Sequence, residues 1–154
     1  MTNTVSHLKL AVILHLSILF YSCGGSEKVV PDKLTEVSGV VTLDGKSLAS
    51  ASVIFTPYSG TKGNGAFGVT DSDGKYTLQH KSGKPGIEPG KYYVIFSKWA
   101  MPNGSPIPAG KSAADVEAKQ VIPKKYLAVT KAGRKNIAEV TGNASSFDFD
   151  LKSK

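Results

Sequence analysis

The sequence predicts an all-β fold, a seven-stranded antiparallel β-sandwich that occupies residues 36–151. Three observations predict it. Short segments of alternating apolar and polar residues recur through this region, which is the two-residue side-chain period of a strand. Turn-forming Gly, Asp, Ser and Pro residues separate the segments roughly every ten residues, as in sandwiches. Only one short stretch, residues 112–120, favours a helix.

Seven segments of the chain have the strand pattern. In order, they span residues 37–43, 51–56, 66–70, 75–79, 90–99, 136–141 and 147–151. In each segment the alternation assigns one set of side chains to the core. The apolar residues that we expect on inward faces are Val37, Val41, Leu43, Ala51, Val53, Phe55, Tyr76, Leu78, Phe147, Phe149 and Leu151.

Turn chemistry separates the first four strands. Asp44-Gly45 follows the first strand and is a strong turn signal, because glycine accepts a positive φ. Pro57 ends the second strand, since proline has no N–H to donate to a ladder. Asp71-Ser72-Asp73-Gly74 predicts a tight turn between the third and fourth strands.

The fifth segment, residues 90–99, is the longest predicted strand. Both of its alternating sets of side chains are largely apolar, so we expect both faces of this strand to be at least partly covered. The two sets are Tyr92, Val94 and Phe96 on one face, and Tyr93, Ile95 and Ser97 on the other.

The strand pattern then breaks in a long loop over residues 100–135, which contains several prolines and glycines. Within it, residues 112–120 favour a short helix, with Ser112 and Asp115 as a capping pair. A loop of this length in a compact domain is either functional or loosely ordered. A small closed barrel is the alternative fold, and the unequal strands and this loop disfavour it.

Residues 1–22 have the pattern of a signal peptide. Lys9 is their one firm positive charge, and the apolar run over residues 10–20 is too short for a bilayer, which needs roughly twenty residues. The run fits the apolar region of a secretory signal. Cys23, the only cysteine in the chain, follows Ser22 directly.

A cysteine at this place resembles the bacterial lipobox, in which lipid is attached to the thiol and cleavage leaves that cysteine as the new N-terminus. Phe20 and Tyr21 are bulkier than the usual residues of the motif. The resemblance implies that Cys23 carries several acyl chains, palmitate among them, which together give stable membrane attachment. The alternatives are an uncleaved helix, a signal without lipid and a cytoplasmic protein. With no second cysteine, the fold cannot depend on disulfides.

Residues 23–35 are polar and predict a flexible tether between the membrane and the domain. Cleavage removes Lys9 and no acid, so the net charge of +7 becomes +6. The lysines are scattered, Arg134 is the only arginine, and no aromatic residues are interleaved with basic clusters. We therefore expect a soluble basic surface with weak attraction for anionic lipid or acidic polysaccharide, and no nucleic-acid partner.

The ordered segments of the domain resemble a carboxypeptidase regulatory-like domain. The segments that carry the resemblance read VSGVVTLDGKSL from residue 37, ASVIFTP from 51, TDSDGKYTL from 70 and PGKYYV from 89. Residues 122–126 and 147–151 are similar to those of small lipoproteins abundant in planctomycete-type bacteria. The resemblance covers residues 36–151. It implies a transthyretin-like (prealbumin-like, Ig-like) sandwich on an envelope surface, and no particular reaction.

No pattern in the domain predicts a catalytic residue, a cofactor site or a metal site. The acids of the turn at Asp71 suggest calcium, but the twelfth residue from Asp71 is Ser82 where an EF-hand needs Glu. His80 is the only histidine left after cleavage. We expect it on a surface loop, because zinc would need further His or Cys ligands. The serines lack a Gly-x-Ser-x-Gly elbow.

Two further hypotheses concern binding and cross-linking. A Lys–Asn isopeptide bond would require a buried acid, for which Glu139 beside Asn136 is the candidate. An aromatic platform for a sugar or peptide would be centred on the 100–135 loop, because binding residues concentrate on loops. Its candidate residues are Tyr92, Tyr93, Trp99 and Tyr126.

The sequence therefore predicts a non-enzymatic lipoprotein of the cell envelope, facing the periplasm or the cell surface, that serves as a structural or interaction module. The expected partners are the membrane, through the N-terminal lipid, and an envelope protein or polysaccharide. A carbohydrate- or small-ligand-binding sandwich is the alternative function, and an enzyme is the least favoured.

Overall fold

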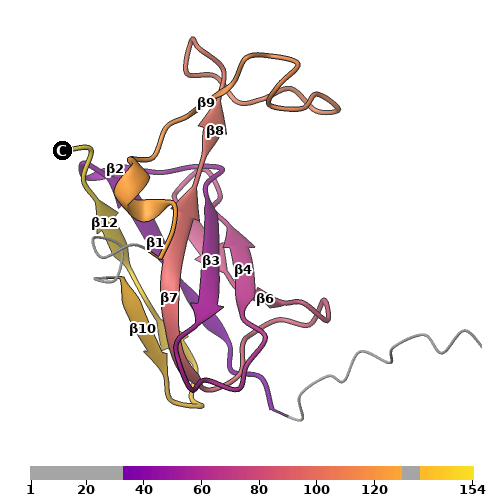
Figure 1. The fold of residues 1–154 in the computed structure, drawn as a ribbon, viewed down its shortest axis with the longest axis vertical. Helices are drawn as coiled ribbons and strands as arrows, with labels where there is room; N and C mark the ends of the chain where they lie inside the picture. Colours follow the sequence, from indigo (N-terminus) through magenta and orange to yellow (C-terminus); the bar gives the residue numbers. More distant parts are fainter. Residues whose placement is uncertain (1–32, 130–135) are drawn as a thin grey trace, which may run out of the picture.

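The computed structural model describes residues 33–129 and 136–154. The regular structure of this part of the chain consists of two five-stranded sheets, a two-stranded ribbon and a 3₁₀-helix, Lys124–Tyr126. Figure 1 shows the ribbon, β8 (Trp99–Ala100) with β9 (Lys119–Gln120), projecting beyond one end of the sheets. The all-β prediction is confirmed, because the described residues form no α-helix.

The first sheet is built around β1 (Val37–Leu43), to which four short strands are hydrogen bonded. β1 pairs antiparallel with β2 (Lys46–Ser47) and β5 (Lys75–Thr77). It pairs parallel with β11 (Ser145–Ser146) and β12 (Phe149–Leu151). The predicted turn between β1 and β2 is present, with positive φ at both of its residues.

The second sheet is antiparallel throughout, in the order β10-β7-β3-β4-β6. Its longest strands, β7 and β3, pair over six residues at its centre. The bounds of the strands are β10 Ile137–Val140, β7 Gly90–Ser97, β3 Ser52–Pro57, β4 Ala66–Val69 and β6 Gln79–His80.

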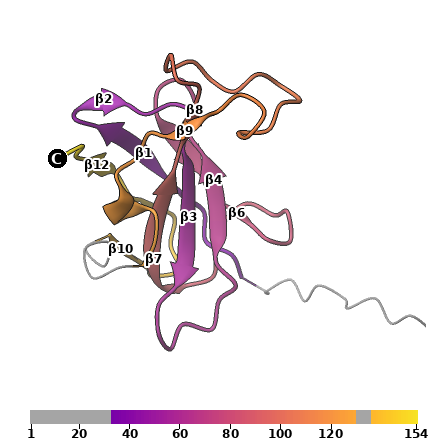
Figure 2. The ribbon, with the colours of Figure 1, turned by 45° about the horizontal axis from the view of Figure 1, so that its top comes forward.

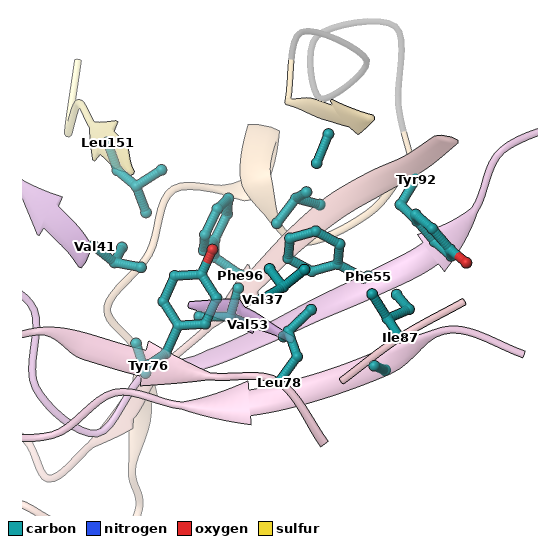
Figure 3. Close-up of a cluster of buried hydrophobic side chains, with 14 of the residues drawn as sticks. Val37, Val41, Val53, Phe55, Tyr76, Leu78, Ile87, Tyr92, Phe96 and Leu151 are labelled. Carbon is teal, nitrogen blue, oxygen red and sulfur yellow. The ribbon is translucent and has the colours of Figure 1, made fainter. Parts of the chain in front are cut away.

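The hydrophobic core lies between the two sheets, where side chains from both meet (Figure 3). The predicted inward residues are confirmed: most are buried, and Leu43, Phe147 and Phe149 are half-buried and pack against the core. Burial of each large apolar side chain contributes about 1.5–3 kcal/mol. The largest fully buried side chains are Tyr92, Phe55, Phe96, Leu78, Ile87, Leu151, Val37, Val41 and Val53.

The strand predicted over residues 75–79 is two strands that belong to different sheets. β5 pairs with β1 in the first sheet, whereas β6 pairs with β4 in the second. Leu78 lies between them, fully buried, and its N–H donates to the Val37 carbonyl at 2.9 Å. The prediction of one strand was wrong because alternation reports which face is buried and not which neighbour a strand has.

The closing strand runs parallel to β1, so the prediction of a purely antiparallel fold is wrong. It is interrupted between β11 and β12, where Asp148 Oδ1 takes the place of a backbone acceptor for the Val40 N–H, at 2.8 Å. The carbonyl of Phe147 packs directly on Gly39, where a Cβ would lie 1.9 Å from its oxygen. Glycine is therefore the residue that fits at this crossing.

Residues 112–120 do not form the predicted helix, although the capping pair forms. The Ser112 N–H donates to Asp115 Oδ2 at 2.8 Å, and the Asp115 N–H donates to Ser112 Oγ at 3.3 Å. The chain then turns at Glu117, which has a φ of 50°, and continues into β9. None of residues 112–120 is buried, so no packing offsets the unfavourable nucleation of a short helix.

Candidate functional site

Cys23, the predicted lipid-attachment residue, lies outside the described residues, as do the signal peptide over residues 1–22 and most of the tether over 23–35. Thr35, at the end of the predicted tether, is part of the fold. It is buried, and it exchanges backbone hydrogen bonds with Ile87 at 2.8 and 2.9 Å. The described residues include no helix with the length and apolar character that crossing a bilayer requires.

His80 is buried, and the prediction of a surface position is wrong. It is 3% exposed, at the end of β6. Its Nδ1 lies 2.8 Å from Ser82 Oγ and accepts the Ser82 N–H at 3.2 Å. Its Nε2 lies 3.1 Å from Glu88 Oε1, although the two are not aligned as a hydrogen bond. His80 continues the inward series of Tyr76 and Leu78 at two-residue spacing, which is the sequence signal that indicates burial.

Glu88 joins this histidine to the core. One carboxylate oxygen accepts the Asn64 N–H at 3.3 Å, and the Glu88 backbone carbonyl accepts the Tyr92 hydroxyl at 2.7 Å. Burial, together with the nearby negative charge of Glu88, raises the pKa of Tyr92 to about 12. The contacts hold the loop between β6 and β7 against the core, so the role of His80 and Glu88 that the geometry supports is structural.

The turn at Asp71 is held by hydrogen bonds and connects β4 of the second sheet to β5 of the first, so it is not a hairpin. Asp71 Oδ1 accepts the N–H groups of Asp73 and Lys75, both at 2.9 Å, so this oxygen stabilises the turn itself. The described residues contain no group of three or more His, Cys, Asp or Glu side chains suited to a metal ion.

Glu139, the candidate acid for an isopeptide bond, has an exposed side chain. It forms an ion pair with Lys91 at 3.3 Å, and the two side chains are more than half exposed. An isopeptide bond needs a buried acid beside it, so the position of Glu139 argues against this hypothesis.

The four aromatic residues considered for a platform do not gather in one place. Tyr92 is fully buried in the core. Tyr126 is half-buried and packs edge-on against Phe96, with ring centroids 6.3 Å apart. Tyr93 lies against Tyr58, with centroids 4.8 Å apart. Of the four, Trp99 presents the most surface, at 49% exposure.

An apolar surface that was not predicted from the sequence lies on the side of the second sheet that faces away from the core. Ile95, Ile54 and Phe67 are direct neighbours across β7, β3 and β4, and we call these three residues the apolar row. Ile54 is 37% and Phe67 47% exposed. Val69 and Ile137, also exposed, extend the same face. The sequence signal is the presence of apolar residues at outward positions of β3 and β7.

A cavity of about 240 Å³ opens beside the apolar row. Ile54, Phe67 and Pro57 line it with apolar surface, and Lys81 supplies a cation. Among the described residues, Lys81 has no ion-pair partner. An apolar wall with one unpaired cation suits an apolar group that carries a nearby negative charge.

A second groove, of about 280 Å³, lies beside Trp99 at the base of the β8–β9 ribbon. Trp99 and Lys98 line it from the ribbon, and the turn at Ser50 and the loop containing Pro106 and Ile107 provide the other walls. Figure 2 shows how the loops of the 100–118 segment gather around this end of the molecule. Trp99 therefore lies in β8, directly before the 100–135 loop where a ligand site was expected, and the three tyrosines are not beside it in the groove.

No family model matches the chain, and no curated protein matches it. Among solved structures, a 9R-lipoxygenase from Cyanothece PCC8801 is similar with a TM-score of 0.34 and 16% sequence identity. The similarity covers 80% of this chain and 17% of the lipoxygenase chain. A likeness this low supports neither a shared fold nor a shared activity.

Proposed function

We propose that this protein is a lipid-anchored envelope protein whose domain is a non-enzymatic interaction module. In this proposal Cys23 carries the lipid, residues 23–33 form the tether, and the domain is a transthyretin-like sandwich of the carboxypeptidase regulatory-like type. The order of the sequence segments supports the family assignment, and two β-sheets packed across one core are compatible with it.

The observation that carries the interaction function is the apolar row. In an antiparallel sheet with one face on the core, the other face is commonly solvated and polar. Here the row crosses three strands, and two of its members, Ile54 and Phe67, are more than a third exposed. Exposed apolar side chains that are contiguous indicate a protein-interaction surface. We infer that a partner protein covers this face.

The arrangement around His80 supports the non-enzymatic part of the proposal. A general base must reach the group from which it takes a proton. The imidazole is 3% exposed, and its nitrogens face Ser82 and Glu88 within the protein. Both neighbours are already used to hold the loop after β6, so the ring is not offered to a substrate.

The anchor is tested by Cys23→Ser, compared with wild type in membrane fractions of the native host. We expect wild type in the membrane fraction with an N-terminal acylated cysteine by mass spectrometry, and the variant released or retained as precursor. Ser22→Ala, which keeps a small residue before the cysteine, is the matched control and should remain acylated. A Cys23→Ser protein that is still processed and membrane-bound would refute the anchor.

The interaction face is tested with a photo-crosslinking amino acid placed at Phe67. We expect a discrete crosslinked protein from this position in intact cells, and none from the same group at Lys46, which is exposed on β2 of the other sheet. Ile54→Asp should abolish the crosslink while circular dichroism stays unchanged. Equal crosslinking from Lys46, or no effect of Ile54→Asp, would refute the proposed face.

The second candidate function, binding of a carbohydrate or other small ligand, is favoured by a separate observation. The groove beside Trp99 combines a half-exposed indole with a lysine and lies outside the apolar row. Binding sites for small ligands are concave and mostly apolar, with a few polar groups that orient the ligand. The groove has this composition.

A further inference from the structure

The groove beside Trp99 has the chemistry of a site for an acidic sugar. We propose that it binds a carbohydrate chain containing uronic-acid residues, with one sugar ring stacked on Trp99 and a carboxylate paired with Lys98. This inference rests on the second candidate function, ligand binding, and names its ligand class. It is independent of the apolar row on the second sheet.

The backbone that carries Trp99 is held in place by the β8–β9 ribbon. Trp99 is paired with Gln120 across the ribbon, and the Val121 N–H donates to the Lys98 carbonyl at 2.8 Å. Gln120 Oε1 accepts the Lys98 N–H at 2.8 Å, and Gln120 Nε2 donates to Ser97 Oγ at 3.1 Å. A binding residue on a backbone fixed in this way loses little backbone entropy when a ligand arrives.

The exposed indole face suits a sugar ring. The face of an aromatic ring carries partial negative charge, and the C–H groups of a pyranose present partial positive charge on one side of the ring. Trp99 is 49% exposed, so one part of its surface is available while the rest is packed. Pro106 and Ile107 add apolar surface beside it, and the exposed Ser50 offers a hydroxyl for the hydrogen bonds of a sugar.

Lys98 selects an acidic sugar over a neutral one. Its side chain is half-buried in the groove and has no ion-pair partner among the described residues. A hydrogen bond between an ammonium and a carboxylate is roughly twice as strong as one between neutral groups. The net charge of +7 further favours the approach of a polyanion.

The walls of the groove favour a sugar over a peptide. Peptides in grooves are commonly held by a ladder of backbone hydrogen bonds to a strand edge. Here the walls opposite Trp99 are the turn at Ser50, which has a φ of 53°, and the loop that includes Gly104. Turns and loops offer no such ladder, so recognition through rings and single charges fits the site better.

The experiment uses the fluorescence of Trp99, which is the only tryptophan in the chain. Full-length protein in detergent is titrated with tetragalacturonate and with the same tetramer fully methyl-esterified, which removes the charges and keeps the rings. We expect a change in the emission of Trp99 with both, and about tenfold tighter binding of the acid. Lys98→Gln should remove this preference, whereas Lys111→Gln, an exposed lysine of the same loop outside the groove lining, should retain it.

The possible outcomes distinguish ligand binding at the groove from its preference for an acidic sugar. Equal affinity for the acid and the ester would refute the acidic class while ligand binding at Trp99 stands. No fluorescence response to either tetramer, with no heat of binding by calorimetry, would refute both. Binding that Lys98→Gln and Lys111→Gln weaken equally would show attraction to the overall charge and refute the assigned site. Calorimetry on Trp99→Leu, with folding checked by circular dichroism, should show binding reduced at least tenfold.

Discussion

The substitution Gly39→Ala tests the closeness of β1 and the closing strand. Gly39 has none of the positive φ values found at several other glycines, so alanine suits its backbone conformation. A Cβ at this position would nevertheless lie 1.9 Å from the Phe147 oxygen and 3.0 Å from a ring carbon of Tyr76. A backbone carbonyl cannot rotate away, so the closing strand must move off β1.

The expected loss of stability follows from three hydrogen bonds at this crossing. The Tyr76 hydroxyl donates to the Phe147 carbonyl at 2.8 Å, and the Phe147 N–H donates to the Ser38 carbonyl at 2.9 Å. The third is the bond from Val40 to the Asp148 carboxylate at 2.8 Å. Each contributes about 1 kcal/mol, so their disruption lowers the free energy of unfolding by about 3 kcal/mol. That is a large share of the ~5–15 kcal/mol that stabilises a typical domain.

The assay is urea unfolding followed by circular dichroism, with Gly45→Ala as the control. Gly45 has open space around it but a φ of 78°, so alanine there should cost about 1–2 kcal/mol through conformation alone. We expect Gly39→Ala to lower the free energy of unfolding by more than Gly45→Ala does, because its Cβ would overlap the Phe147 carbonyl. A loss below about 1 kcal/mol at Gly39 would refute the close packing of Phe147 on this glycine.

Three further changes test other contacts. The pKa of Tyr92 is about 12 in the fold and about 10 when unfolded, so the stabilisation from the neutral, buried phenol is complete below pH 10 and declines as the pH rises to 12. Thermal midpoints should therefore fall more steeply between pH 10 and 12 for wild type than for Tyr92→Phe. Parallel curves for the two proteins would contradict this. His80→Ala removes a buried ring and its hydrogen-bond contacts with Ser82, and should lower the free energy of unfolding in urea by about 1–3 kcal/mol. Lys91→Ala removes one member of an exposed ion pair and should cost under about 1 kcal/mol. Similar costs for the two variants would count against a structural role for His80. Asp71→Ala removes the acceptor of two N–H groups and should cost about 1–2 kcal/mol by the same measurement, and a neutral effect would contradict its role in the turn.

The parts of the fold that follow a local rule could be predicted from the sequence. The inward residues of β1 and β3 were predicted correctly, because side chains alternate strictly along a strand that has one face on the core. The turn at Asp44-Gly45 was also correct, since its backbone needs positive φ values that glycine adopts readily. All of the sequence information that these two predictions need lies within a few consecutive residues.

The features that depend on distant neighbours were not predictable in this way. Leu78 is as buried as the alternation requires, but nothing in its segment shows that β5 and β6 belong to different sheets. The closing strand alternates equally well whether it runs parallel or antiparallel to β1. Ser112 and Asp115 make the hydrogen bonds of a helix cap, yet the chain turns because no apolar face is packed there. The apolar row forms only when register aligns Ile95, Ile54 and Phe67.

The positions of the two proposed surfaces are compatible with simultaneous use by an anchored protein. The described chain enters the fold at Leu34–Thr35, beside Ile87, at one end of the sheets, whereas the β8–β9 ribbon projects from the other end (Figures 1 and 2). With lipid on Cys23, about eleven residues would separate the anchor from Leu34, a reach of at most about 36–40 Å. The groove beside Trp99 lies at the end of the domain opposite this attachment point, where a polymer can reach it while the apolar row on the flank is open to a protein in the same membrane. The two sites therefore do not compete for one orientation of the domain, and blocking the groove with an acidic oligosaccharide should leave crosslinking from Phe67 unchanged.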